Sequence, residues 1–404
     1  MSADYDLVCF SHLRWDFVFQ RPQHLLSRCA RERDVLFVEE PIFGASTAQV
    51  ELKQADGVTI VVPRLPDGCS PEQVCSLQRQ LLDVLLARRV RSPMALWYYT
   101  PMALPFTRHL QRVATIYDCM DELANFKGAP PLLGQLEREL LGRADLVFTG
   151  GHSLYEHKRP HHPRVFPFPS SVDVPHFAAA RQSGDEPADQ AAIAHPRLGF
   201  FGVIDERMDL ELLAAVAAAR PEWQLVMLGP VVKIDPATLP KLPNIHWLGG
   251  KTYKELPRYI AGWDVALLPF ACNEATRFIS PTKTPEYLAA GKPVVSTPIR
   301  DVVRPYGEMG LVAIAQDPQE FIAAIEGALS EQGDGRQQQA DGWLSHLSWD
   351  RTWGEMAQLI KDVAAQNAQT EYLRVASAAA NARGVRPHLT SPVVRQPELV
   401  VGAP

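Results

Sequence analysis

The residues best suited to chemistry lie in one segment, Ser280 to Ser296 (SPTKTPEYLAAGKPVVS). Thr284 can cap a helix with Pro285 at its first position, which places Glu286 in the first turn. Free N–H groups at a helix start, with Lys283 beside them, suit a nucleotide diphosphate, and the Glu286 carboxylate can accept a hydrogen bond from a ribose hydroxyl. The capping signals fit an ordinary capped helix equally well, so they leave both interpretations open.

The same segment resembles the donor-binding motif of GT-B glycosyltransferases, especially the retaining enzymes of glycosyltransferase family 4. That family carries two glutamates eight positions apart, followed by a Gly-Lys/Arg-Pro-Val-Val strand. Glu286 matches the second glutamate, which holds the ribose in the family, and Phe278 stands at the position of the first. The resemblance therefore implies an altered contact with the sugar ring, with Asn273 or Glu274 as candidate substitutes.

Other landmarks of this resemblance follow in the expected order. The run 198–204 (LGFFGVI) resembles the first strand and glycine turn of the donor domain, and the run 245–249 (IHWLG) resembles the strand whose following loop receives the nucleotide base. Val203 and Met208 occupy the positions where the family usually places an Arg and a Lys on the diphosphate, which leaves Arg207 as a nearby cation. The resemblance implies these donor-binding residues: Gly202, Arg207, Gly249, Lys251, Pro281, Thr282, Lys283 and Glu286.

The N-terminal half resembles a narrower group, the TuaH-like bacterial glycosyltransferases of polysaccharide biosynthesis. The resemblance lies in three runs, at 12–15 (HLRW), 21–26 (RPQHLL) and 117–122 (YDCMDE). It implies a role in building teichuronic acid, capsule or exopolysaccharide.

Ligands of open parallel sheets bind outside the carboxyl ends of the strands, so the loops at those ends are the candidate site in this half. We expect Asp118, Asp121 and His152 to be catalytic and His12, Trp15 and Arg21 to lie on the acceptor side. Each has a structural alternative. His152 can cap a helix, Asp121 and Glu122 can form a solvated helical turn, and Trp15 can belong to the core.

Short apolar runs alternate with helical patterns along the chain, which predicts doubly wound parallel sheets. We expect an α/β protein of the GT-B fold, with two Rossmann-like domains facing across a cleft. The predicted parts are an acceptor-side domain at 1–180, a linker at 181–196, a nucleotide-sugar domain at 197–345, a helix crossing back at 346–366 and a mobile tail at 367–404.

Composition restricts the functions that remain. The net charge of −6 argues against a general nucleic-acid binder, and six scattered cysteines without a C-x-x-C pair fit a reduced, cytoplasmic protein. No signal-peptide pattern and no apolar run long enough to span a membrane occur, so we expect a cytoplasmic protein, with a place at the inner face of the membrane left open. Metal-ligand spacing is absent as well.

Taken together, these patterns predict a metal-independent, retaining glycosyltransferase of hexosyltransferase type. Its donor is a nucleotide-diphosphate sugar, which is a substrate and not a cofactor, and its acceptor is a glycan or a lipid-linked glycan. Peripheral membrane contact and contacts with other polysaccharide-assembly proteins stay open. Two alternatives also stay open: a GT-B sugar-nucleotide epimerase, and a non-catalytic nucleotide-sugar-binding or scaffold protein.

Overall fold

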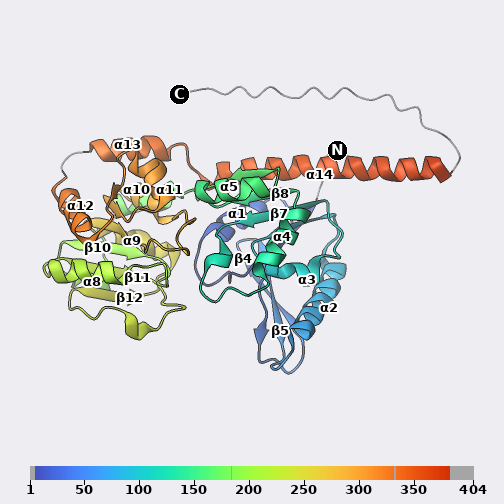
Figure 1. Cartoon of the computed structure of the whole chain (residues 1–404), viewed down its shortest axis with the longest axis horizontal. Helices are drawn as coiled ribbons and strands as arrows, with labels where there is room; N and C mark the ends of the chain where they lie inside the picture. The colour runs from blue at the N-terminus through green and yellow to red at the C-terminus, as the bar shows by residue number, and fades with distance from the viewer. Residues whose placement is uncertain (1–4, 183, 332–333, 383–404) are drawn as a thin grey trace.

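Two parallel sheets divide the chain into two lobes that lie side by side (Figure 1). The computed structural model describes residues 5–182, 184–331 and 334–382. The first lobe is built on a nine-stranded sheet and the second lobe on a six-stranded sheet. The architecture is that of the predicted GT-B fold, and the two lobes meet at a cleft lined by loops of both.

The first sheet has the strand order β3-β5-β2-β1-β6-β7-β8-β9, with β4 pairing antiparallel to β5 and every other pair parallel. Its central strands are apolar on both faces because helices cover both sides, as parallel sheets require. The strands are β1 (Asp6–Phe10), β2 (Val35–Val38), β3 (Ile42–Phe43), β4 (Gln49–Ala55), β5 (Val58–Leu65), β6 (Met94–Tyr98), β7 (Ala114–Cys119), β8 (Leu146–Thr149) and β9 (Val165–Pro167). The helices are α1 (Arg21–Cys29), α2 (Pro71–Arg89), α3 (Leu104–Thr107), α4 (Leu133–Arg143) and α5 (His152–Lys158).

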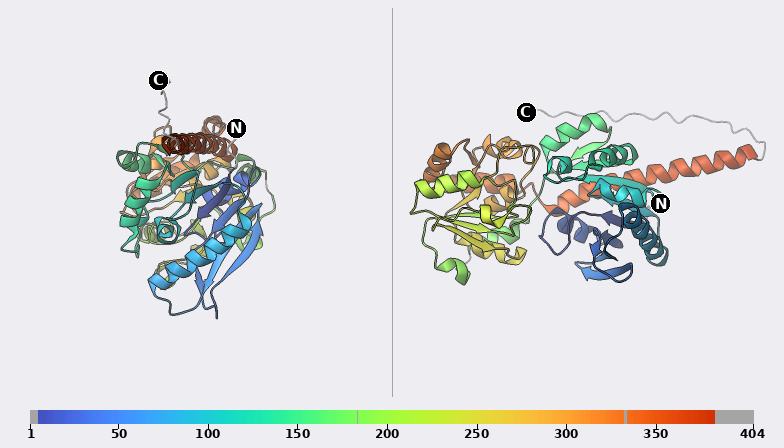
Figure 2. Two further views of the ribbon diagram at one scale, coloured as in Figure 1. Left: turned by 90° about the vertical axis from the view of Figure 1, so that its right-hand side faces the viewer. Right: turned by 60° about the horizontal axis from the view of Figure 1, so that its bottom comes forward.

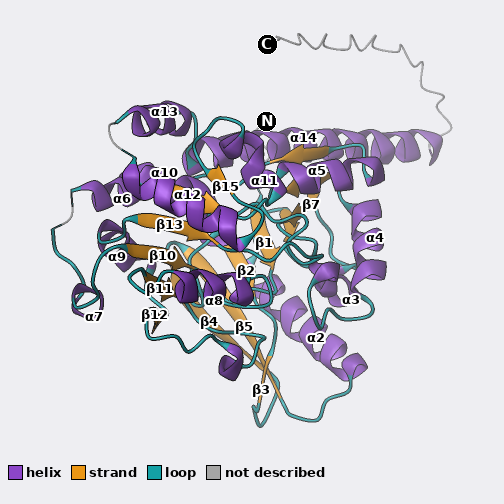
Figure 3. Ribbon diagram, turned by 60° about the vertical axis from the view of Figure 1, so that its left-hand side comes forward, coloured by secondary structure: helices purple, strands orange, loops and turns teal. Residues whose placement is uncertain are grey.

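The second sheet is parallel throughout, in the order β12-β11-β10-β13-β14-β15, and Figure 3 shows helices on both sides of its strands. Its strands are β10 (Arg197–Phe201), β11 (Gln224–Leu228), β12 (Ile245–Gly249), β13 (Val265–Leu268), β14 (Val294–Ser296) and β15 (Ala313–Ile314). Its helices are α8 (Leu210–Ala219), α9 (Leu256–Ala261), α10 (Lys283–Ala289), α11 (Arg300–Val302), α12 (Pro318–Ser330) and α13 (Gly335–Leu344).

The chain enters the second lobe earlier than the predicted domain end at residue 180. Val172 and Phe177, the latter in α6 (Val174–Ala178), are buried in the second lobe's core. The predicted linker is also packed, because it contains α7 (Ala188–Ala191) and the buried Gln190, whose side chain bonds to Tyr259 O and the Trp263 indole. Polar composition predicted an interdomain linker, and these side-chain hydrogen bonds hold the segment against the second lobe.

Helix α14 (Trp349–Ala382) carries the chain back to the first lobe and lies along it, as Figure 2 shows. The buried residues of this helix that belong to the first lobe's core include Trp349, Trp353, Met356 and Ile360. The helix continues to Ala382, well past the predicted end at residue 366. Residues 383–404 of the predicted tail lie outside the described part of the chain. Among the described helices, none is both long and apolar enough to cross a bilayer.

Candidate functional site

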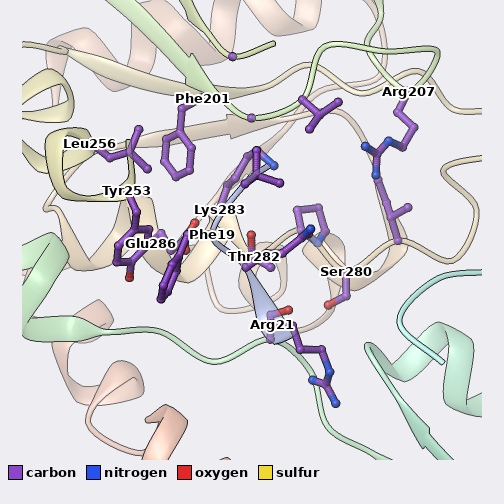
Figure 4. Close-up of a pocket in the computed structure, with 18 of the residues that line it drawn as sticks. Phe19, Arg21, Phe201, Arg207, Tyr253, Leu256, Ser280, Thr282, Lys283 and Glu286 are labelled. Carbon is purple, nitrogen blue, oxygen red and sulfur yellow. The ribbon is translucent and has the colours of Figure 1, made fainter. Parts of the chain in front are cut away.

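The candidate site is a cavity of about 190 Å³ between the lobes, which we call the cleft cavity. Its walls are loops at the carboxyl ends of β10, β11 and β13 in the second lobe and of β7 and β8 in the first. This is the position expected for ligands of open parallel sheets. Figure 4 shows Tyr253, Leu256 and Glu286 on one side of the cavity, Arg207 and Ser280 on the other, and Lys283 between them.

The helix that carries Lys283 and Glu286 begins earlier than the sequence suggested. Helix α10 starts at Lys283, so Thr284 is a buried helical residue and not the cap. The Thr284 N–H donates to Pro281 O, so the first turn closes before Thr284 and not after it. Pro285 is tolerated in this turn because N–H groups of a first turn have no intrahelical partner. Glu286 remains in the first turn and Gly291, with φ +81°, ends the helix as expected. The expected donor residues Pro281, Thr282, Lys283 and Glu286 all line the cleft cavity.

Gly202 makes room for the Lys283 side chain, and Gly229 makes room for the backbone of Gly202. Gly202 has φ +141°, and a Cβ there would lie 2.2 Å from Lys283 Cε. Gly229 has φ +147°, and its Cβ would lie 1.7 Å from Gly202 O. The glycine turn after β10 therefore lets the backbone approach Lys283 more closely than any L side chain would permit.

Burial shifts the pKa values of the Lys283 and Glu286 side chains in the first turn of α10. Burial lowers the pKa of Lys283, and the nearby Arg207 guanidinium lowers it further. Burial raises the pKa of Glu286, although the Lys283 ammonium acts in the opposite direction. Glu286 Oε2 is buried and has no hydrogen-bond partner among the described residues, so it is available to accept from a ligand hydroxyl.

Arg207 is the second cation on this wall. Its guanidinium pairs with Asp205 at 2.7 Å and lies over the Phe126 ring of the first lobe, 5.5 Å from the centroid. Val203 lines the cavity without a charge, and Met208 is buried in the core, so neither supplies the family's usual cation.

The expected base-side residues divide into two groups. Lys251 lines the cleft cavity, and its ammonium pairs with Asp189 at 2.6 Å. Gly249, with φ +71°, turns the chain after β12 and is not among the lining residues.

Sequence reasoning missed an aromatic pair here. Tyr253 stacks on Phe19 of the first lobe with ring centroids 4.5 Å apart, and both line the cavity. The sequence contained one signal for this pair, because both aromatic residues lie in polar loops just after predicted strands. Ligands of open parallel sheets bind at that end of the strands.

The two predicted catalytic aspartates occupy different positions. Asp121 lines the cavity, and burial raises its pKa while Arg207 opposes the shift. Asp118 is completely buried, and its carboxylate accepts from Arg21 Nε and NH2, each at 2.9 Å. Arg21 lines the cavity and also donates to Phe168 O. Asp118 itself is not among the residues that line the cavity, and its carboxylate is occupied by Arg21.

The remaining first-lobe candidates lie outside the cleft cavity. Trp15 is a core residue, which was the structural alternative for it, and its ring packs edge-on against Phe37 with ring centroids 5.0 Å apart. The pKa of His12 is lowered to about 4 by burial and by Lys233. His152 is the exposed first residue of α5 and lines a neighbouring cavity. Glu122 pairs with Lys158 at 2.7 Å in a buried cluster, so the Asp121–Glu122 pair does not form a solvated turn.

Phe278 points away from the cleft cavity and stacks on His157 of α5, with ring centroids 4.6 Å apart. Neither candidate substitute takes its place, because Asn273 and Glu274 are exposed and do not line the cavity. Apart from Glu286, Asp121 is the carboxylate that lines this cavity. Among the described residues, no group of three or more His, Cys, Asp or Glu side chains is arranged to hold a metal ion.

Residues 195–331, which contain the glycine turn and α10, match the family of glycosyl transferases group 1. The protein named as teichuronic acid biosynthesis glycosyltransferase TuaH, from Bacillus subtilis (strain 168), is 28% identical over 272 residues, which are 63% of this chain and 68% of TuaH.

Solved structures share the fold at low sequence identity. Sucrose-phosphate synthase from Thermosynechococcus elongatus superposes with a TM-score of 0.69 at 15% identity, over 90% of this chain and 100% of that one. HepE of Anabaena, solved with UDP and glucose, superposes with a TM-score of 0.63 at 14% identity, over 88% and 98% of the two chains. An E. coli trehalose-6-phosphate protein, solved with UDP-2-fluoro glucose, superposes with a TM-score of 0.66 at 13% identity, over 88% of this chain and 99% of that one. The chain therefore has the GT-B fold, its residues 195–331 match the family of glycosyl transferases group 1, and it is similar to TuaH at 28% identity.

Proposed function

We propose that this chain transfers a sugar from a nucleotide-diphosphate sugar to a glycan or lipid-linked acceptor during the synthesis of a bacterial surface polysaccharide. The observation that carries the proposal is the first turn of α10 in the cleft cavity. There, a cation and a glycine turn lie together with a buried carboxyl oxygen that has no hydrogen-bond partner in the described part of the chain. These groups match the charges and hydroxyls of a nucleotide diphosphate.

The reaction breaks the bond between the sugar and the diphosphate, so its main electrostatic task is to stabilise the departing diphosphate. Lys283 and Arg207 supply positive charge where the family's usual Arg and Lys are absent. A pair of side-chain cations can neutralise this charge without a metal ion, and we propose metal-independent transfer with retention of the anomeric configuration. TuaH, which is named for teichuronic acid biosynthesis, supports the polysaccharide role.

Asp121 is our proposed contact for the transferred sugar or the attacking hydroxyl, because it faces the second lobe's donor wall from the first lobe. Arg21 also lines the cavity, and its buried guanidinium is held by Asp118 and Phe168 O. A carboxylate that arrives from the opposite lobe can orient hydroxyl groups only when the lobes enclose the substrate.

The donor assignment is tested by titrating UDP, GDP, ADP and dTDP into the full chain by calorimetry, with EDTA present throughout. One nucleotide should bind selectively under these conditions. Glu286→Ala should weaken that binding by about 1–3 kcal/mol, because it removes a buried carboxyl group that can form a hydrogen bond with the ligand.

Glu274→Ala is the matched control, since Glu274 is an exposed carboxylate of the same lobe outside the cavity. Unchanged affinity in Glu286→Ala would refute the donor site. Binding and transfer that appear only after Mg²⁺ replaces EDTA would refute metal independence. A conversion of the donor sugar without any acceptor would favour the epimerase.

A further inference from the structure

The loop after β7 reaches from the first lobe to the second, and we call its residues 121–127 the bridging loop. The Asn125 side-chain amide donates to Glu274 O at 3.1 Å, and the Lys127 N–H donates to Glu206 Oε1 at 3.2 Å. Both acceptors belong to the second lobe, in the segments that follow β13 and β10. The end of the bridging loop is therefore attached to the lobe that carries the donor wall.

Phe126 lies between these two hydrogen-bonded residues, and its ring meets two cations of the second lobe. Arg207 Cζ is 5.5 Å from the ring centroid, and Lys233 Nζ is 5.2 Å from it. Both distances are within the range at which the face of an aromatic ring attracts a cation. Phe126 packs against none of the hydrophobic cores of the described residues. Its ring therefore contributes to the contact with the cations and not to the interior of either lobe.

The Arg207 side chain is held from two directions. The Asp205 carboxylate accepts from Arg207 Nε at 2.9 Å and from Arg207 Nη2 at 2.7 Å, and the Phe126 ring lies against the guanidinium from the other lobe. Neither contact uses Nη1, and a ring attracts a cation without carrying a net negative charge of its own. Arg207, which lines the cleft cavity, is thus fixed in place while Nη1 can still donate to an anionic ligand.

The first residue of the bridging loop faces the same charges. Asp121 lines the cleft cavity, and burial raises the pKa of its carboxyl group while Arg207 opposes the shift. The charges of Lys233 and Lys283 also lower this pKa. One loop of the first lobe therefore brings both a carboxyl group and an aromatic ring to the cations of the donor wall.

We propose that Phe126 is a positioning residue of the donor site. Its ring, supplied by the first lobe, holds Arg207 of the second lobe where the guanidinium can donate to the diphosphate. The Lys233 contact and the two hydrogen bonds fix the ring on the second lobe, so the diphosphate site is complete only when the bridging loop lies there. This role rests on the proposed function, because it requires a nucleotide diphosphate beside Arg207.

The test is a double-mutant cycle on the full chain, with nucleotide affinity measured by calorimetry. The probe is the one of UDP, GDP, ADP and dTDP that binds the natural chain most tightly. Phe126→Leu keeps an apolar side chain without the ring, and it should weaken binding by about three- to tenfold, on the scale of one cation–π contact. Phe126→Tyr keeps the ring and should bind within about twofold of the natural chain.

Arg207→Gln should weaken binding by itself, and adding Phe126→Leu to it should cause no further loss, because the ring acts through the guanidinium. Phe43→Leu is the matched control, since Phe43 is an exposed phenylalanine of the first lobe outside the cleft cavity. It should bind the nucleotide as the natural chain does.

Unchanged affinity in Phe126→Leu would overturn the positioning role and leave the donor site intact. An equal loss from Phe126→Leu with and without Arg207 would also overturn it, because the ring would then pack the lobes together without acting on the guanidinium. If none of the four nucleotides binds the natural chain, the proposed function fails, and the role of Phe126 fails with it.

Discussion

Asp118 and Asp121 lie three positions apart, and the fold gives them different surroundings. The Asp118 carboxylate is enclosed and holds Arg21 in a two-pronged pair, whereas Asp121 reaches the cleft cavity. Removing one partner of a buried ion pair leaves the other charge uncompensated, while a carboxylate at a cavity wall acts on the ligand.

Asp121→Asn should therefore lower the rate of sugar transfer by about 100-fold or more, which is the usual contribution of a positioned acid–base group. The affinity for the nucleotide should stay within a few-fold of the natural chain's affinity. Asp118→Asn should lower the free energy of unfolding by about 3–5 kcal/mol, because Arg21 loses its counter-charge. Urea unfolding and initial rates on the same preparations separate the two effects. Wild-type transfer by Asp121→Asn would remove that residue from the site.

A second prediction about a single residue concerns Gly202. Gly202→Ala places a Cβ against the Lys283 side chain and should weaken nucleotide binding by about 1–3 kcal/mol through overpacking. Gly310→Ala is the control, because Gly310 also has a positive φ, +69°, but has open space around its Cβ position. Calorimetry should show a loss of affinity only for Gly202→Ala, and an equal loss in both would mean that the glycine serves the backbone alone.

Among the elements, α1 and α14 are joined by a stacked aromatic pair. The His24 ring of α1 lies parallel to the Trp349 ring of α14, with centroids 4.5 Å apart and planes 8° apart. Burial, together with the Arg28 and His176 charges, lowers the pKa of His24 to about 3. The helix that returns from the second lobe is thus anchored by an imidazole that must stay neutral.

This contact should make the chain sensitive to acid. Between the ordinary pKa near 6.5 and the lowered value, the unfolded chain binds a proton that the folded chain excludes, so the free energy of unfolding falls as pH falls. The expected slope from His24 is about 1.4 kcal/mol per pH unit.

Urea unfolding at a series of pH values below 6.5 measures this slope. His24→Phe keeps a stacking ring without a proton site and should flatten the slope, whereas the control His161→Phe, at an exposed residue, should not. An unchanged slope in His24→Phe would mean that other groups cause the acid sensitivity.

Across the whole molecule, the lobes are held together by covalent crossings and by direct contacts. Helix α14 buries Trp353 and Met356 in the first lobe after leaving the second, and Arg300 of α11 pairs with Glu156 of α5. The far part of α14 is different, since its side chains at 371–375 are exposed. Stability should therefore depend on the near part of α14 alone.

Truncation after residue 372 should change Tm by less than about 2 °C, because the described side chains removed bury no apolar surface. Trp353→Ala should instead cost about 3–5 kcal/mol of unfolding free energy, the usual cost of a large buried aromatic residue. Scanning calorimetry compares both with the full chain. A large loss of Tm on truncation would show that the end of the chain packs against the body.

The sequence by itself determined the class of fold and the donor wall. Apolar runs of strand length alternate with helical patterns, and this local pattern is enough to predict the strands and helices. In the SPTKTPEYLAAGKPVV run, Lys283 and Glu286 are three residues apart, so they lie one helical turn apart wherever the helix begins. Local patterns could not place the helix start exactly, because Pro281 and Pro285 both fit a first turn.

Only the tertiary structure decided which lobe supplies each group of the site. Burial and partners are set by contacts between distant residues, so the sequence could not tell that Arg21 encloses Asp118 or that Phe278 turns to His157. For the same reason, Tyr253 and Phe19 became neighbours only when the two lobes came together.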